Sequence, residues 1–120
     1  MKEKIVGGTN IALKIPKSQF ADVIKFYKDL GFDLKEQSGF ATPSFSCTFG
    51  SNTLWIDCVD HIGKADIWLE LVADHIPNAL ERVRQSGGMQ RDEIESLPDD
   101  MHAHWVCDPA GNTLLLKKKP

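Results

Sequence analysis

The chain has 120 residues, of which 42% are hydrophobic and 26% are charged, and its formal net charge at pH 7 is −3. This length suits one domain that buries its own core, and the composition excludes a disordered, collagen-like or disulfide-dense chain. The mildly acidic balance argues against non-specific binding to nucleic acid or to an anionic membrane. We therefore expect a globular domain with no nucleic-acid partner and no membrane partner.

Two further features point to a cytoplasmic protein. No apolar run reaches the ~20 residues that a membrane-spanning helix needs, and the opening residues MKEKIVGGTN lack the apolar core of a secretory signal. Cys47, Cys58 and Cys107 are odd in number and form no CxxC pair, so we expect reduced, buried thiols, with a catalytic thiol as the alternative.

The first half of the chain predicts one strand, one helix and three further strands. Residues 10–15 alternate apolar and polar side chains, which predicts a strand with two different faces. Ser18 is a candidate N-cap, and Gly31 is the expected stop of the helix that follows. The apolar positions of this helix are Phe20, Val23, Ile24, Tyr27 and Leu30. The three later strands are expected at 32–38, 43–49 and 52–59.

The second half repeats this order after a polar connection at residues 59–64. A strand is expected at 66–72, followed by a helix that Asp74 caps and that stops at Ser86-Gly87. The closing strands are expected at 89–95, 102–107 and 112–118. A shift of 60 residues aligns Phe45 with Trp105, Cys47 with Cys107 and Leu54 with Leu114. A shift of 56 aligns Asn10 with Asp66, Leu13 with Leu69 and Gly31 with Gly87. Turn residues match as well as apolar ones, which indicates an internal duplication.

Three motifs resemble those of the glyoxalase/bleomycin-resistance/extradiol-dioxygenase group, the vicinal oxygen chelate superfamily. They are Phe26-Tyr27-Lys28-Asp29-Leu30-Gly31-Phe32, the turn Asp108-Pro109-Ala110-Gly111-Asn112, and the strand Asn10-Ile11-Ala12-Leu13-Lys14-Ile15. The resemblance implies one α+β domain over residues 1–120, made of two tandem βαβββ modules at about 8–59 and 65–118. It also implies a partly open, curled mixed β-sheet with helices on its outer face, a cavity between the modules, and a homodimer.

Metal-dependent members of this family place ligands on the first and last strands of each module. The matching positions here are Asn10, Trp55, Asp66 and Leu115, although a one-residue slip would put Ile67 in place of Asp66. Leucine and tryptophan cannot ligate an ion, and two oxygen donors make a poor transition-metal site. We therefore expect no metal and no other cofactor.

Other residues offer alternatives that the sequence leaves open. His102 and His104 have a spacing that can chelate a metal on one face of a strand, or they are polar residues of the surface or cavity. Asp57 with Asp66, or Lys14 with Glu70, are candidate acid/base pairs, and cross-strand ion pairs are the other interpretation. Trp55, Trp68 and Trp105 lie in predicted strands, where they line a cavity or pack in the core.

The preferred interpretation is a metal-free protein that binds a small organic molecule, a drug or a metabolite, as bleomycin-resistance proteins do. The predicted ligand-binding residues are Asn10, Trp55, Asp66, Trp68 and Leu115, with Trp55 as a stacking platform. The alternative is a divalent-metal-dependent lyase, isomerase or dioxygenase with ligands at other positions. The sequence leaves open whether the protein is an enzyme.

Overall fold

The computed structural model describes residues 4–120, and residues 1–3 of the expected domain lie outside this range. By its internal contacts the chain divides into two compact units. The N-terminal unit is Thr9–Trp68, and the C-terminal unit combines the described residues up to Gly8 with Leu69–Pro120. Neither helix of the described residues is long and apolar enough to cross a membrane.

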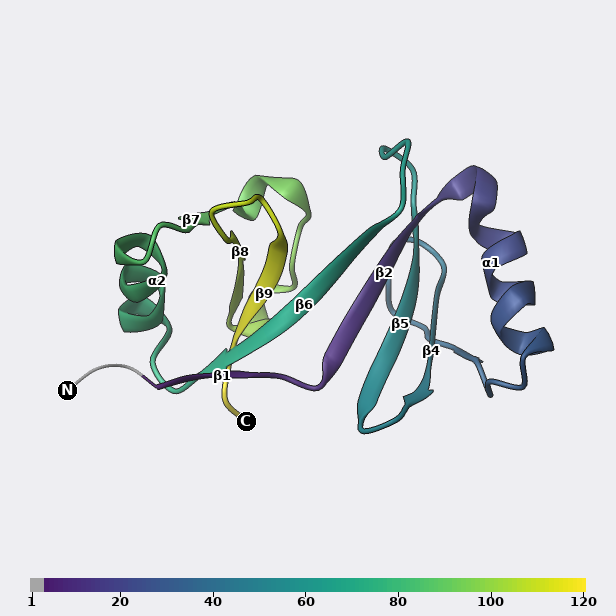
Figure 1. Ribbon diagram of the computed structural model, residues 1–120, viewed down its shortest axis with the longest axis horizontal. Helices are drawn as coiled ribbons and strands as arrows, with labels where there is room; N and C mark the ends of the chain where they lie inside the picture. The colour runs from purple at the N-terminus through teal and green to yellow at the C-terminus, as the bar shows by residue number, and fades with distance from the viewer. Residues whose placement is uncertain (1–3) are drawn as a thin grey trace. The chain divides into compact units, whose positions relative to one another are not determined.

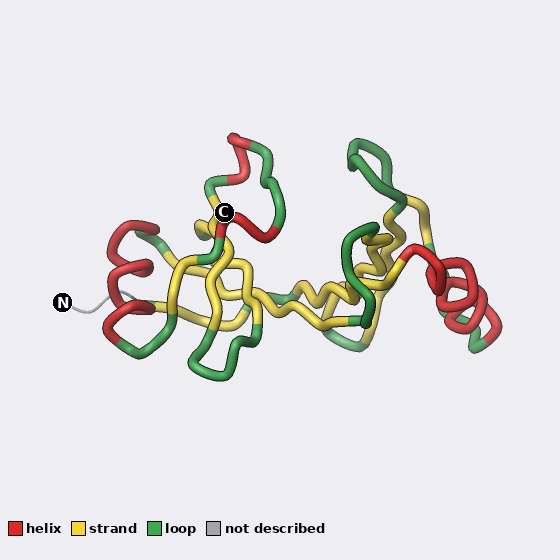
Figure 2. The backbone as a smooth tube through the Cα atoms, turned by 90° about the horizontal axis from the view of Figure 1, so that it is seen from above, coloured by secondary structure: helices red, strands yellow, loops and turns green. Residues whose placement is uncertain are grey.

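The N-terminal unit is a mixed sheet with one helix on one face (Figures 1 and 2). Its elements are β2 (Asn10–Pro16), α1 (Lys17–Asp29), β3 (Lys35–Glu36), β4 (Ser44–Phe49), β5 (Asn52–Val59) and the start of β6 (Asp66–Ala73). The strand order is β3-β4-β5-β2-β6, in which β2 runs parallel to β5 and antiparallel to β6. The α1 helix packs on β2, β4 and β5 through a core of buried apolar residues. These are Ile15, Ile24, Leu34, Cys47, Leu54 and Ile56.

The C-terminal unit has the same plan with an added strand at its edge. Its elements are β1 (Ile5–Gly7), the rest of β6, α2 (Ile76–Gln85), β7 (Met89–Gln90), β8 (Ala103–Cys107) and β9 (Thr113–Lys118). Two 3₁₀ turns, η1 (Asp92–Ile94) and η2 (Asp99–Met101), lie between β7 and β8. The strand order is β1-β6-β9-β8-β7, and α2 packs on a core of Ala73, Ala79, Val106 and Leu116. The predicted α+β fold of two βαβββ modules is confirmed.

Several local predictions were wrong. The β1 strand was not expected, and the strands expected at 32–38 and 89–95 shrink to two residues each. The N-cap position of α1 is Pro16 rather than Ser18, and no side chain caps that end. The cap of α2 is His75, whose Nδ1 accepts a hydrogen bond from the backbone N–H of Asn78 at 3.3 Å, rather than Asp74.

The two motif turns have clear physical roles. Gly31 and Gly87 follow the two helices with φ angles of 102° and 98°, a left-handed conformation that glycine adopts without strain. In the last turn, Asp108 accepts hydrogen bonds from the N–H groups of Ala110 and Asn112, both at 2.9 Å. Its second oxygen accepts from the side-chain amide of Asn112, and these bonds lower the pKa of Asp108. The turn is therefore a structural motif.

The register of the second hairpin differs by one residue from the sequence alignment. Cys47 pairs with Leu54 on β4 and β5, and Val106 pairs with Leu114 on β8 and β9. The turn between β8 and β9 therefore holds one more residue than the turn between β4 and β5. As a result, the alignment by a shift of 60 residues is wrong for β8. Because a one-residue shift reverses the face of a strand, Trp105 lies on the opposite face from the one that this alignment gave it.

The opening strands differ from the alignment by two residues. The ladder partners are Leu13 with Ile56 in one unit and Leu71 with Leu116 in the other. Leu13 thus corresponds to Leu71 rather than to Leu69. By this ladder the counterpart of Asn10 is Trp68 rather than Asp66, on the same face, because a two-residue shift preserves the face.

Candidate functional site

The face of the N-terminal sheet opposite α1 carries polar and aromatic side chains. On β2, the residues Ile11, Leu13 and Ile15 pack toward the helix, so alternation turns Asn10 and Lys14 to the other face. The ladders place side chains from β4, β5 and β6 on the same face. We call this set the polar face: Asn10, Lys14, Ser44, Trp55, Asp57, Asp66 and Trp68.

Two tryptophans of the polar face are held by side-chain oxygens. The indole Nε1–H of Trp55 donates to Oδ1 of Asn10 at 2.8 Å, and that of Trp68 donates to Oδ2 of Asp66 at 2.9 Å. The structure therefore joins four of the five predicted ligand-binding residues in two pairs. Asn10 and Asp66, two of the predicted ligand-binding residues, here fix the positions of the two rings.

A buried lysine lies beside these rings. Lys14 is only 4% exposed, and its Nζ donates to Oδ2 of Asp57 at 2.8 Å. The other oxygen of Asp57 accepts from the hydroxyl of Ser44 at 2.5 Å. The ammonium of Lys14 also lies 4.4 Å from the ring centroid of Trp68, within range of a cation–π contact. For these charged residues the structure shows a cross-strand ion pair, between Lys14 and Asp57.

One aromatic residue near the polar face was missed by the sequence analysis. Phe40 lies in the loop before β4, is 53% exposed, and meets the ring of Trp55 edge-on at 5.9 Å and 74°. The available signal was an aromatic residue beside Gly39 in a turn, where a large apolar side chain has no core to enter. Phe40 and Trp55 together offer apolar surface at one end of the polar face.

Leu115 belongs to the C-terminal unit and lies opposite α2 in that unit. It is the ladder partner of both Glu70 and Trp105. Trp105 is buried and its Nε1–H donates to the carbonyl oxygen of Glu95 at 3.0 Å, as expected of a packed residue. Glu70 is 8% exposed and lies so close to Gly8 that a Cβ there would be 2.1 Å from its Oε1.

The residues at the four family ligand positions do not fit a divalent metal ion. Leu115 has no donor atom, and the indole nitrogen of Trp55 can only donate a proton. The oxygens of Asn10 and Asp66 accept indole hydrogens, and Asp66 accepts the N–H of Ile67 as well. Across residues 4–120, no cluster of three His, Cys, Asp or Glu side chains is placed to hold a metal ion.

The two histidines near β8 do not both lie on that strand. His102 precedes β8 in a left-handed conformation with φ of 51° and is exposed. His104 is on β8, on the α2 side with Val106, and its Nδ1 lies 2.8 Å from Oδ2 of Asp92. The two side chains therefore do not share a strand face, which excludes the chelating alternative and leaves the other one, polar residues of the surface or cavity.

All three cysteines are buried and free, as the sequence indicated. Burial raises the pKa of the Cys47 and Cys58 thiols, with smaller contributions from Asp33 and Asp60 respectively. A thiol with a raised pKa is a poor nucleophile near neutral pH. Their packing in the strands is thus a structural feature.

Comparison with known proteins shows similarity in structure. No protein-family profile matches the chain, and no curated protein matches its sequence. Methylmalonyl-CoA epimerase from Mycobacterium tuberculosis is 12% identical with a TM-score of 0.65, over 97% of this chain and 89% of that one. The Mn(II)-bound glyoxalase from Novosphingobium aromaticivorans is 14% identical with a TM-score of 0.65, over 97% of this chain and 40% of that one.

A third structure matches over nearly the full length of both chains. It is a glyoxalase/bleomycin resistance protein/dioxygenase superfamily member from Vibrio splendidus 12B01, 13% identical with a TM-score of 0.56, over 98% of this chain and 100% of that one. At such identities the shared property is the fold. The chain therefore has the fold of the glyoxalase/bleomycin-resistance/dioxygenase superfamily, the one that its sequence motifs resemble.

Proposed function

We propose that the polar face of the N-terminal unit binds a small, partly aromatic organic molecule without a metal ion. The observation that carries this proposal is the pair of tryptophans whose indole N–H groups are fixed by Asn10 and Asp66, beside the buried Lys14–Asp57 ion pair. Small-molecule sites typically combine aromatic walls with a few positioned polar groups.

The distribution of side chains in the unit supports a binding role. The apolar core lies between the sheet and α1, so the polar face is not needed to bury the helix. A buried ion pair is seldom a gain in stability over apolar residues of similar size. Phe40, exposed and edge-on to Trp55, supplies a wall against which a flat ligand can pack.

Ligand binding by a Trp55→Ala variant tests this proposal. A thermal-shift screen of aromatic metabolites and drugs identifies a ligand of the wild-type protein, and titration calorimetry then compares the variants. We expect Trp55→Ala to weaken binding at least about fivefold, because a truncated aromatic anchor typically costs over ~1 kcal/mol.

Two phenylalanine variants act as a matched pair in the same assay. Phe40→Ala should weaken binding about threefold or more, because an aromatic contact contributes ~0.5–1.5 kcal/mol. Phe49→Ala should leave binding unchanged, since Phe49 is also exposed but stacks on Phe32. Wild-type affinity in Trp55→Ala would contradict the proposal.

A metal-dependent enzyme is the second candidate, because one similar structure is a Mn(II)-bound glyoxalase and another is an epimerase. Such an enzyme would need ligands other than the four family positions. Elemental analysis of protein purified without chelator separates the two candidates. We expect clearly substoichiometric Mn, Fe, Ni and Zn, and one tightly bound equivalent of any of them would favour the enzyme.

A further inference from the structure

A groove of about 500 Å³ lies on the α1 side of the N-terminal sheet, away from the polar face. One wall is α1, the other is the entry to β6, and the floor is formed by Leu13 and Ile15 of β2. The other lining residues are Gln19, Asp22, Val23, Phe26, Tyr27, Ala65, Asp66 and Ile67. Its volume falls within the ~300–1,000 Å³ of small-molecule sites.

The helix wall follows from the sequence spacing of α1. Asp22, Val23 and Phe26 lie three, four and seven residues after Gln19. The four residues therefore form one row along the helix. Phe26 is 56% exposed, and Ile67 on the opposite wall is 57% exposed. Two large apolar side chains on facing walls of a groove are typical of a surface that binds a partly apolar ligand.

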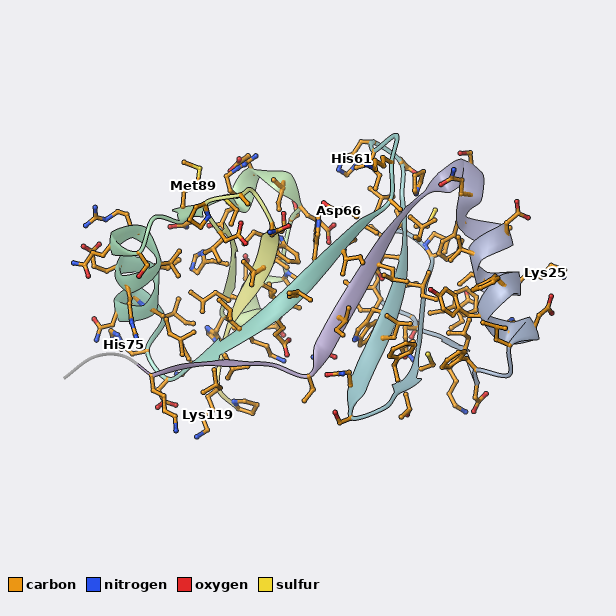
Figure 3. All side chains as sticks on the ribbon, in the orientation of Figure 1. Lys25, His61, Asp66, His75, Met89 and Lys119 are labelled. Carbon is orange, nitrogen blue, oxygen red and sulfur yellow. The ribbon has the colours of Figure 1, made fainter. Side chains whose placement is uncertain are left out.

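The charge of the groove has one sign. Asp22 and Asp66 line it, and its lining residues, all within the described part of the chain, include no lysine, arginine or histidine. Lys25 on the same helix is directed away from the sheet and pairs with Asp29 at 2.5 Å (Figure 3). Asp66 is the first residue of β6. The carboxylate of Asp66 already accepts the indole hydrogen of Trp68 and the N–H of Ile67, so Asp22 is the lining carboxylate that would attract a cationic ligand.

We propose that this groove binds a small organic cation with an apolar body, such as a protonated or quaternary amine. Leu13, Val23 and Ile67 would contact the apolar body, and the carboxylate of Asp22 would face the charge. The ring of Phe26, held edge-on to Tyr27 at 5.2 Å and 86°, offers a face for a cation–π contact. The groove lies on the α1 side of the sheet and shares only Asp66 with the polar face, so this site is separate from the one in the proposed function.

Three probes that share an apolar phenylalkyl tail and differ in charge test the proposal: 4-phenylbutylamine, 4-phenylbutan-1-ol and 4-phenylbutyrate. Each is titrated into the full-length ¹⁵N-labelled protein, and amide chemical shifts are followed by NMR. We expect saturable shifts for the amine at residues 19–27 and 65–67. The alcohol should bind about threefold or more weakly, and the butyrate more weakly still, because an ion pair at a partly exposed site contributes ~0.2–1 kcal/mol.

Three variants sharpen the test. Asp22→Asn should weaken the amine about threefold and leave the alcohol unchanged, whereas Asp60→Asn, which removes a charge outside the groove, should change neither. Ala65→Trp, which fills the groove from an exposed position, should abolish saturation by the amine while the dispersed amide spectrum reports an intact fold.

Three results would overturn the proposal. Equal affinity for the three probes would remove the role of charge. Shifts at Lys14 and Trp55 instead of α1 would assign the amine to the polar face. Concentration-dependent broadening of residues 19–27 without probe would make a second copy of the chain the occupant.

Discussion

At the scale of single residues, the most informative side chain is Lys14. A lysine that is 4% exposed has lost nearly all of its hydration, and its charge is compensated by Asp57 and by the ring of Trp68. Asp57 in turn holds Ser44, which is 3% exposed. Side chains from β2, β4, β5 and β6 thus depend on one another, so Lys14, Asp57, Ser44 and Trp68 form one network.

Removal of the ammonium should destabilise the unit strongly. Lys14→Met keeps the length of the side chain but leaves the carboxylate of Asp57, with its side chain 20% exposed, without its cation. We expect the free energy of unfolding to fall by about 3 kcal/mol, measured by urea denaturation at pH 7.

The double variant Lys14→Met/Asp57→Leu is the control for this effect. It removes both charges, so much of the lost stability should return. The single variants Lys14→Met and Asp57→Leu each lose some unfolding free energy. If the loss in the double variant equalled the sum of these two losses, the ion pair would not be the cause.

At the scale of secondary-structure elements, η1 is attached to β8 by one carboxylate. Asp92 accepts a hydrogen bond from the backbone N–H of Trp105 at 2.9 Å, and its other oxygen contacts His104 and Gln90. Burial alone would raise the pKa of Asp92, but these hydrogen bonds together outweigh it, and the pKa lies below its ordinary value. This carboxylate thus links the irregular connection after β7 to the sheet.

This link should weaken in acid. Because the pKa of Asp92 is lowered in the folded protein, its contribution to stability is complete above the unfolded value of ~3.9 and is lost as pH falls below it. The unfolding free energy of wild type should exceed that of Asp92→Asn at pH 6, and the difference should shrink between pH 4 and pH 3. Asp99→Asn, a substitution on η2, should show no such convergence.

The sequence predicted the long elements and missed the short ones for a physical reason. The strand at 10–15 and the helix at 18–30 have regular apolar spacing, and both are present with small changes at their ends. The β1 strand has only three residues, and its pairing with Leu71–Ala73 depends on a segment over 60 residues away, which local patterns do not report.

The candidate site was predictable in its positions and not in its contacts. The family motifs located Asn10 and Trp55, which the structure joins by a hydrogen bond. The partner of Lys14 depends on the parallel register of β2 and β5, and the place of Phe40 depends on a loop. Neither register nor loop conformation follows from residue spacing alone.

At the scale of the whole molecule, we propose that two copies of the chain associate, as the family resemblance implies. Large apolar side chains are exposed in both units, among them Leu30 at 61% and Leu69 at 47%. Where such side chains lie together in one patch, they mark a surface that binds a partner. Sedimentation velocity at micromolar concentration should show a dimer, and a single species of 13.4 kDa would contradict this.

The division of the chain also sets an order for its folding. The N-terminal unit is one continuous segment that ends at Trp68, whereas the C-terminal unit needs the strand Ile5–Gly7, made before that segment, to pair with residues made after it. During synthesis, every residue of the N-terminal unit is available before β9 exists. We therefore infer that β1 waits unpaired on the ribosome until residues 71–73 emerge, and that the C-terminal unit closes after the N-terminal unit.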